Sequence, residues 1–349
     1  MYGAILGDII GSIYEFDQNN IKTKEFPLFG ARCTYTDDSV MALAVAKVMC
    51  EQATRMELEP DKMYSDEELK KRLIASLIEW GQKYPDAGYG ARFIHWLNED
   101  SPQPYNSWGN GSAMRVASVG WLFEDLDYTR KMARLSAEIT HNHPEGIKGA
   151  ESVASAIFLA REGKTKEEIK EYIVKEFSYD LSRKLDDIRP TYHHVESCQE
   201  TVPEAITAFL EGNSFEDVIR NAVSLGGDCD TLTCIAGSIA EAFYLIPFEL
   251  LGECEKRLPE DLAGLLLPFK SRRISSAAEK AQFDKKIGDM ESETVFAGEV
   301  IRNLMFCVYH YSYEDAYELV LGDGPGAIPE DLRDETVEDM ATELGYGCG

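Results

Sequence analysis

The segment that most constrains this chain is Gly226-Gly227-Asp228-Cys229-Asp230-Thr231, which runs directly into an apolar helix predicted from Leu232 to Tyr244. Paired glycines permit a tight turn with torsion angles that a side chain would forbid. In an extended or turn backbone, the spacing of Asp228 and Asp230 directs both carboxylates to one side and Cys229 to the other. The helix is rich in small residues, so we expect it to lie in the core with the two acids at its mouth. Helix capping is the alternative interpretation of this segment taken alone, because Asp and Thr are common N-cap residues.

A second segment of the same kind is Thr36-Asp37-Asp38-Ser39, which precedes an apolar helix predicted to reach about Cys50. Alone it also reads as an N-cap, but together the two segments provide four carboxylates. Such a cluster repels itself strongly unless it is protonated or neutralised by cations. No His or Cys with ligand spacing lies beside either segment, and all-oxygen ligands favour hard ions. The sequence therefore predicts a site for Mg²⁺, Mn²⁺ or Ca²⁺.

The N-terminal segment, residues 2–16, carries glycines at positions 3, 7 and 11. Each glycine inside a helix costs about 1 kcal/mol relative to alanine, so this spacing indicates close contact between helices. Asp8 and Glu15 are the only charged residues of the segment. Acids in so apolar a segment either cap a helix or face a site, and for Glu15 both interpretations remain open.

A glycine-rich segment, Ser107-Trp108-Gly109-Asn110-Gly111-Ser112, precedes a helix predicted from about Ala113 to Leu122. Backbone N–H groups at such a helix start can bind an anion, although the ending of a Walker loop is missing. A plain glycine turn is the alternative. Arg115, one turn into the helix, either reaches a phosphate or pairs with an acid. His141 lies at a helix junction, and we expect the Tyr192–His194 loop to be solvated.

The rest of the chain predicts helices and gives no convincing alternating strand pattern. We therefore predict an all-α fold, with one domain over residues 1–321 and an acidic C-terminal tail over residues 322–349. The further predicted helices cover residues 66–81, 128–139, 145–161, 201–211, 214–223, 276–286, 293–308 and 313–321.

Composition limits the partners and the compartment. The chain has 62 Asp+Glu against 35 Lys+Arg and a net charge of −27, so non-specific binding to nucleic acid or anionic membranes is not expected. No apolar run approaches the ~20 residues of a membrane span, and the N-terminus lacks the basic region of a signal peptide. The 8 cysteines form no CxxC pair. We expect reduced thiols and a cytoplasmic protein. The oligomeric state cannot be read from the sequence.

Taken together, these motifs resemble the ADP-ribosylglycohydrolase family, which is typified by the dinitrogenase-reductase-activating glycohydrolase. The matching motifs follow one another in the family's order over roughly residues 1–250, and the last hundred residues have no match. Two positions depart from the family pattern: Ser39 stands where Thr is usual, and Tyr35 where many members have Trp. These departures affect substrate detail rather than activity. The motifs are Gly7-Asp8…Glu15, Thr36-Asp37-Asp38, Gly109-Asn110-Gly111…Met114-Arg115, Thr140-His141 and Gly226-Gly227-Asp228-Cys229-Asp230-Thr231.

The resemblance implies an all-α domain with two adjacent Mg²⁺ or Mn²⁺ ions and an ADP-ribosylated substrate. The 107–111 loop would hold the diphosphate, and His141 would match a histidine of the ADP-ribose cleft. The implied metal ligands are Thr36, Asp37, Asp38, Asp228, Asp230 and Thr231. The implied substrate-binding residues are Ser107, Trp108, Gly109, Asn110, Gly111, Met114, Arg115 and His141.

The implied chemistry is cleavage of the bond from ribose C1″ to an acceptor, through a transition state with oxocarbenium character. Glu15, the family's acid near the metals and ribose, is predicted to act as base or to assist the leaving group, and Asp38 and Asp228 are the other catalytic candidates. Two alternatives remain: a non-catalytic, crystallin-like relative, which would be expected to lose metal ligands, and another binuclear hydrolase such as a phosphatase. The acceptor remains open among arginine, serine, a nucleic-acid base and a small molecule.

Overall fold

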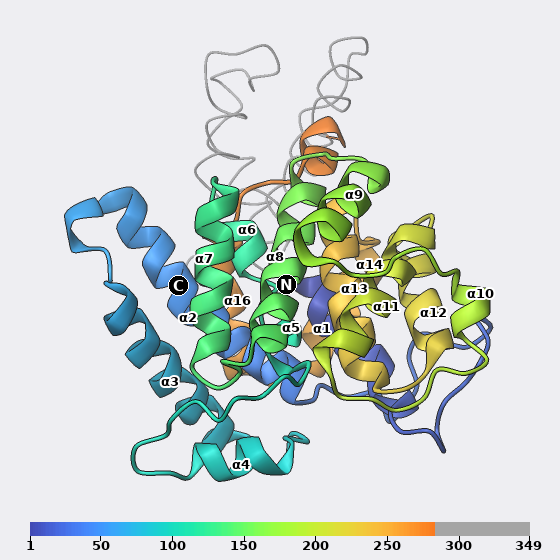
Figure 1. Ribbon diagram of the computed structural model, residues 1–349, viewed down its shortest axis with the longest axis horizontal. Helices are drawn as coiled ribbons and strands as arrows, with labels where there is room; N and C mark the ends of the chain where they lie inside the picture. Colours follow the sequence, from blue (N-terminus) through green and yellow to red (C-terminus); the bar gives the residue numbers. More distant parts are fainter. Residues whose placement is uncertain (283–349) are drawn as a thin grey trace, which may run out of the picture.

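The computed structural model describes residues 1–282, and in this part the regular elements are helices (Figure 1). The predicted all-α fold is thereby confirmed. One isolated antiparallel bridge joins Gly109 to Ser197. The elements are α1 (Tyr2–Gly11), the short 3₁₀ helix η1 (Ser12–Tyr14), α2 (Asp37–Leu58), η2 (Pro60–Lys62), α3 (Asp66–Lys83), α4 (Ala91–Leu97), α5 (Gly111–Met114), α6 (Val119–Leu122), α7 (Leu126–Glu138), α8 (Pro144–Arg161), α9 (Lys166–Phe177), α10 (Leu185–Ile188), α11 (Cys198–Glu211), α12 (Phe215–Leu225), α13 (Cys229–Phe243), α14 (Phe248–Arg257), α15 (Glu260–Gly264) and α16 (Leu266–Arg272).

The centre of the fold is the contact between α1 and α13, which lie side by side in the middle of the molecule (Figure 1). The three glycines of α1 make this contact possible. A Cβ at Gly3 would lie 2.1 Å from the carbonyl oxygen of Gly237, and one at Gly7 would lie 2.2 Å from that of Thr233. At Gly11 a Cβ would lie 2.6 Å from Cα of Asp230. The predicted close helix contact is therefore confirmed, and it brings the end of α1 against the start of α13.

The starts of α2 and α13 lie at the same end of the core. Thr36 is the N-cap of α2, and its hydroxyl accepts a hydrogen bond from the backbone N–H of Asp38 at 3.3 Å. Asp228 is the N-cap residue of α13, although its side chain makes no capping bond. Helix capping thus explains the position of the Thr36 hydroxyl at the start of α2. It does not explain the carboxylates at the starts of α2 and α13.

The helix predicted over residues 113–122 is wrong, because the chain forms two short helices there, α5 and α6. The backbone leaves α5 at Arg115, whose torsion angles are φ −91° and ψ 0°. The buried guanidinium of Arg115 donates to the carbonyl oxygen of Ser136 at 2.8 Å and to Oγ1 of Thr140 at 2.7 Å. This long-range anchor cannot be read from local helix propensity.

One long helix, α9, was not predicted although the sequence carries its signals. Thr165 and Glu168 form a capping box at its start. Ile169, Ile173 and Phe177 recur at intervals of four and are buried against the core. By contrast, α3, α7, α8, α11 and α12 lie close to their predicted ranges, and α2 continues past Cys50 to Leu58.

The predicted helices over 293–308 and 313–321, and the predicted tail over 322–349, lie outside the described residues. The helix predicted over 276–286 begins at Ala277. Within residues 1–282, no helix is long and apolar enough to span a membrane. The six cysteines of this part of the chain are unpaired and buried.

Candidate active site

Carboxylates from three separate segments converge at one end of the core. Asp37 and Asp38 come from the start of α2, Asp228 and Asp230 from the start of α13, and Glu15 from the residue after η1. Oxygen atoms of Glu15, Asp228 and Asp230 lie within 4.8 Å of one another, and so do those of Asp8, Asp38 and Asp230. Both groups have the spacing that a cation requires, and Asp230 belongs to each.

The side chain of Asp8, on α1, fixes the Thr36 segment by hydrogen bonds. It is fully buried in α1 and accepts hydrogen bonds from the backbone N–H of Thr36 at 2.9 Å and from that of Ser39 at 3.1 Å. The hydroxyl of Thr36 donates to Oδ1 of Asp8 at 2.7 Å, and the hydroxyl of Ser39 donates to Oδ2. Burial raises the pKa of Asp8 to about 6, although these hydrogen bonds oppose the rise. The sequence predicts no specific role for Asp8, because its hydrogen-bond partners lie 28 to 31 residues away.

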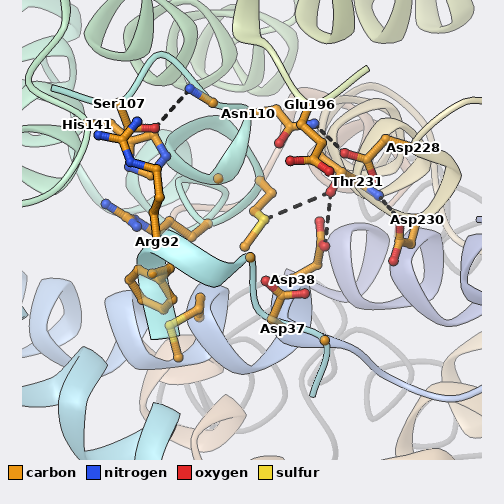
Figure 2. Close-up of a pocket in the computed structure, with 18 of the residues that line it drawn as sticks. Asp37, Asp38, Arg92, Ser107, Asn110, His141, Glu196, Asp228, Asp230 and Thr231 are labelled. Atoms are coloured by element: carbon orange, nitrogen blue, oxygen red, sulfur yellow. Dashed lines mark hydrogen bonds between the residues drawn. The ribbon is translucent and has the colours of Figure 1, made fainter. Parts of the chain in front are cut away.

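The two segments predicted to bind metal contact each other through Asp38 and Thr231. Oγ1 of Thr231 donates to Oδ2 of Asp38 at 3.1 Å, as the dashed line in Figure 2 shows. Asp38 is 1% exposed, and its other oxygen, Oδ1, has no hydrogen-bond partner among the described residues. A buried carboxylate oxygen without a donor is costly. A bound cation would satisfy this atom.

Asp228 is held by a tight Gly-Gly turn and a neighbouring amide. Gly226 and Gly227 have φ values of 71° and 78°, which favour glycine. Nδ2 of Asn110 donates to Oδ2 of Asp228 at 2.6 Å, so the 107–111 loop and the α13 start form one unit. Burial raises the pKa of Asp228 to about 7, and the charge of Glu15 contributes to the rise.

The other carboxylates also favour protonation when no cation is present. Burial, followed by the negative charge of Asp230, raises the pKa of Asp37 and Asp38 well above the usual range. Burial, followed by the charge of Asp228, does the same for Asp230. The half-buried Glu15 has a pKa raised to about 7 by desolvation and by Asp230. Buried carboxylates that also repel one another are the kind of group that divalent cations neutralise.

These residues line one end of a cavity of about 420 Å³. Figure 2 shows Arg92, Ser107 and His141 together on one side of it and the labelled aspartates with Thr231 on the other. The cavity is therefore polarised, with cationic and neutral donors facing a carboxylate cluster. The cavity can hold a ligand that places an anionic group near the donors and another group near the carboxylates.

Most of the predicted site residues lie on this cavity. Thr36 does not line it, because its hydroxyl is directed to Asp8. Trp108 also does not line it; the residue is 47% exposed, and its ring packs against that of His143 in a T-shaped arrangement with 5.5 Å between centroids. The predicted residues on the cavity wall are Glu15, Asp37, Asp38, Ser107, Gly109, Asn110, Gly111, Met114, Arg115, His141, Asp228, Asp230 and Thr231.

The 107–111 loop is fixed by backbone bonds to a second loop. The N–H of Asn110 donates to the carbonyl oxygen of Glu196 at 2.8 Å, and that of Cys198 donates to the carbonyl oxygen of Trp108 at 3.0 Å. A Cβ at Gly109 would lie 3.2 Å from Oγ of Ser107, so the loop has little room for a side chain. The helix that follows has only 4 residues, so it contributes less dipole than the long helix that the sequence predicted.

His141 is kept neutral behind this loop. Burial lowers its pKa well below the usual range, and the charge of Arg115 adds to this effect. Nδ1 of His141 bonds to Oγ1 of Thr140 at 2.7 Å, while Nε2 lies on the side of Gly109 and Gly111. Within residues 1–282, Arg115 forms no ion pair with an acid, and its side chain donates to Ser136 and Thr140 instead.

Several cavity residues were missed by the sequence analysis. The Tyr192–His194 loop was expected to be solvated, but His194 lines the cavity and packs on Phe16, with 5.1 Å between ring centroids. Its neighbour Glu196 bonds to it at 3.2 Å. These residues lack a recognisable spacing relative to the acids, so no local signal identifies them. The lining residues that were not predicted are Phe16, Met41, Gly88, Gly90, Ala91, Arg92, Phe93, Tyr105, His194 and Glu196.

Comparison with known proteins supports the resemblance seen in the sequence. The chain is 29% identical over 315 residues to ADP-ribosylhydrolase ARH3 of Homo sapiens, with 69% of this chain and 83% of that protein covered. It is 25% identical over 275 residues to ADP-ribosylarginine hydrolase Tri1 of Pseudomonas putida, with 70% and 69% covered. A solved structure described as an ADP-ribosylglycohydrolase-related protein complex matches with a TM-score of 0.54 at 23% identity, covering 76% of this chain and 94% of that one, which supports the fold. Because the model of the ADP-ribosylglycohydrolase family matches residues 1–279, the chain belongs to the ADP-ribosylglycohydrolase family.

Proposed function

We propose that this protein is a metal-dependent ADP-ribosyl hydrolase, which cleaves the glycosidic bond between ADP-ribose and an acceptor. The observation that carries the proposal is the polarised cavity, which joins a carboxylate cluster to a wall of anion-binding groups. The acidic end suits cations and ribose hydroxyls. The opposite end, with Arg92 and the backbone of the 107–111 loop, suits a diphosphate.

The cations would be two Mg²⁺ or Mn²⁺ ions held by Asp37, Asp38, Asp228, Asp230 and Thr231, with Thr36 at the edge of the set. The unpartnered Oδ1 of Asp38 and the converging oxygens of Asp38, Asp228 and Asp230 support the central part of this assignment. All these donors are oxygens, which fits hard ions. When bound, such ions orient ribose hydroxyls and lower the pKa of a water molecule.

The side chains and backbone of the protein would then have separate roles in proton transfer and in substrate binding. Glu15 borders both the cavity and Asp230, so it is placed to accept a proton from the attacking water or to assist the leaving group. Asp38 and Asp228 are the remaining proton acceptors of the cluster. Neutral His141 and the 107–111 loop would orient the nucleotide part, because the loop is fixed to residues 196–198.

The six unpaired cysteines of residues 1–282 support a reducing compartment, and we propose the cytoplasm. The single domain over residues 1–321 also remains a proposal.

The proposal is tested by incubating the protein with Mg²⁺ or Mn²⁺ and a panel of ADP-ribosylated acceptors, with products identified by mass spectrometry. The panel contains ADP-ribosyl-arginine, ADP-ribosyl-serine, an ADP-ribosylated base and a small-molecule conjugate. Free ADP-ribose with an intact diphosphate is the expected product. Release of inorganic phosphate would instead identify a phosphatase, and binding of ADP-ribose without turnover of any conjugate would identify a non-catalytic relative.

A further inference from the structure

One side chain fastens the segment that carries Glu15 to the turn that carries Asp228. Nδ2 of Asn20 donates to the carbonyl oxygens of Tyr14 and Phe16, each at 2.8 Å. Oδ1 of the same amide accepts from the backbone N–H of Gly227 at 2.7 Å. The two carbonyl groups flank Glu15 in sequence, and Gly227 immediately precedes Asp228. The amide therefore links the proposed proton-transfer group to a proposed metal-ligand segment.

The backbone on both sides of this link has positive φ values, at Phe16 and at Gly226 and Gly227. Phe16 has φ 65°, an unusual value for a residue with a large side chain. Such conformations persist where surrounding contacts hold them, and they are concentrated at functional sites. On the other side, a Cβ at Gly226 would lie 2.3 Å from Oδ1 of Asn20. The Gly-Gly turn thus provides the space that the Asn20 amide occupies.

Three other side chains of this loop, those of Asp17, Asn19 and Lys22, bond to groups other than the carbonyls of Tyr14 and Phe16. Oδ1 of Asp17 accepts from the backbone N–H of His194 at 2.7 Å. Nζ of Lys22 donates to the carbonyl oxygens of Tyr192 and Leu225. Nδ2 of Asn19 donates to the carbonyl oxygen of Glu15 at 2.9 Å, but its side chain is exposed and its bond stays within the loop. Asn19 is therefore a matched control: the same residue type, one position away, without the connection to the turn.

We propose that Asn20 is a positioning residue for the glycosidic step, fixing Glu15 relative to Asp228 and Asp230. The inference rests on the proposed function. Asn20 is not one of the described residues that line the cavity, so it acts through the backbone rather than on the substrate. Removing its amide should therefore change turnover much more than ligand binding, because a misplacement of about 1 Å can cost ~10²-fold in rate.

The experiment compares Asn20→Ala, Asn20→Asp and Asn19→Ala with the wild-type protein. Asn20→Asp keeps an acceptor for Gly227 but replaces the donor that holds Tyr14 and Phe16. For each protein we would measure kcat, KM, the affinity for ADP-ribose by calorimetry, the melting temperature, and hydrogen–deuterium exchange of peptides covering residues 12–22.

Both Asn20 variants should lose about 10- to 100-fold in kcat, with KM and ADP-ribose affinity within about threefold of wild type. Asn19→Ala should keep its kcat within about threefold. Exchange in residues 12–22 should rise in the Asn20 variants and stay near wild type in Asn19→Ala.

Equal kcat in the Asn20 and Asn19 variants would overturn the inference, and so would unchanged exchange in residues 12–22. A variant that loses ADP-ribose affinity and melting temperature together with kcat would identify Asn20 as a general structural residue, which also overturns it. A wild-type protein without any turnover refutes the proposed function instead. In that case the exchange measurement still decides whether Asn20 holds the loop.

Discussion

Thr231 donates a hydrogen bond of 3.1 Å to Asp38 across 193 residues of sequence. Each residue lies in the first turn of a long helix, α13 or α2, and both helices are packed on α1. The bond therefore connects two segments that the core has already brought together. The second oxygen of Asp38 is buried and has no donor among the described residues.

The metal assignment predicts that ligand substitutions lower metal content. Asp37→Ala and Asp230→Ala should each reduce bound Mg²⁺ or Mn²⁺ below two per chain, because each removes a carboxylate from the cluster. Metal analysis after gel filtration measures the stoichiometry. Asp100→Ala, which changes an exposed acid away from the cavity, should retain the wild-type value. Full metal content in both site variants would contradict the assignment.

Substitution of Gly109 in the 107–111 loop should weaken nucleotide binding selectively. A side chain at Gly109 meets Ser107 at 3.2 Å and His141 at 3.4 Å, so Gly109→Leu should weaken ADP-ribose binding at least about tenfold, or 1.4 kcal/mol. Metal content should stay at the wild-type level. Gly252→Leu is the control, because a Cβ there meets nothing within 4 Å. If calorimetry gave equal affinity for wild type and Gly109→Leu, the loop would be only a turn.

Glu15 is predicted to take part in proton transfer. General acid–base groups typically contribute ~10²- to 10⁴-fold, so Glu15→Gln should lose activity on that scale. Folding, metal content and ADP-ribose affinity should remain close to wild type. Glu196→Gln removes a carboxylate from the same cavity, but that side chain is 71% exposed and bonds to His194, so we expect a loss below about tenfold. Full activity of Glu15→Gln would transfer the role to Asp38 or Asp228.

The raised pKa values predict a stability profile that depends on metal. Burial raises the pKa of Asp8 to about 6 and those of Glu15 and Asp228 to about 7 in the metal-free protein. A carboxyl whose pKa is higher when folded stabilises the fold fully below its unfolded pKa, and that contribution disappears as pH rises through the folded pKa. The melting temperature of the chelator-treated protein should therefore fall between about pH 4 and pH 7.

Added Mg²⁺ should remove most of that fall, because a bound cation favours the ionised carboxylates. Differential scanning calorimetry over this pH range, with chelator or with millimolar Mg²⁺, provides the comparison. Identical curves in the two conditions would show that the cluster does not bind the ion.

The sequence predicted the local parts of the site and missed those that depend on long-range contacts. Asp37, Asp38, Asp228 and Asp230 were found because each pair precedes an apolar helix, a pattern contained in a few residues. His194 was expected to be solvated, but it lines the cavity, and its backbone N–H donates a hydrogen bond to Asp17, 177 residues away in sequence. The break at Arg115 also depends on distant partners, Ser136 and Thr140. Local propensity carries no information on such contacts.

The close contact between Gly11 and Asp230 predicts a site outside the cavity at which substitutions should inactivate the protein. Gly11 is no part of the cavity wall, yet a Cβ there would lie 2.6 Å from Cα of Asp230. Even alanine at this position must push the start of α13 away from α1 and so widen the gap between the carboxylates. A genetic screen for inactive alleles should therefore recover changes at Gly11 together with changes at the acids themselves, and a map restricted to ligand-contacting residues would overlook them.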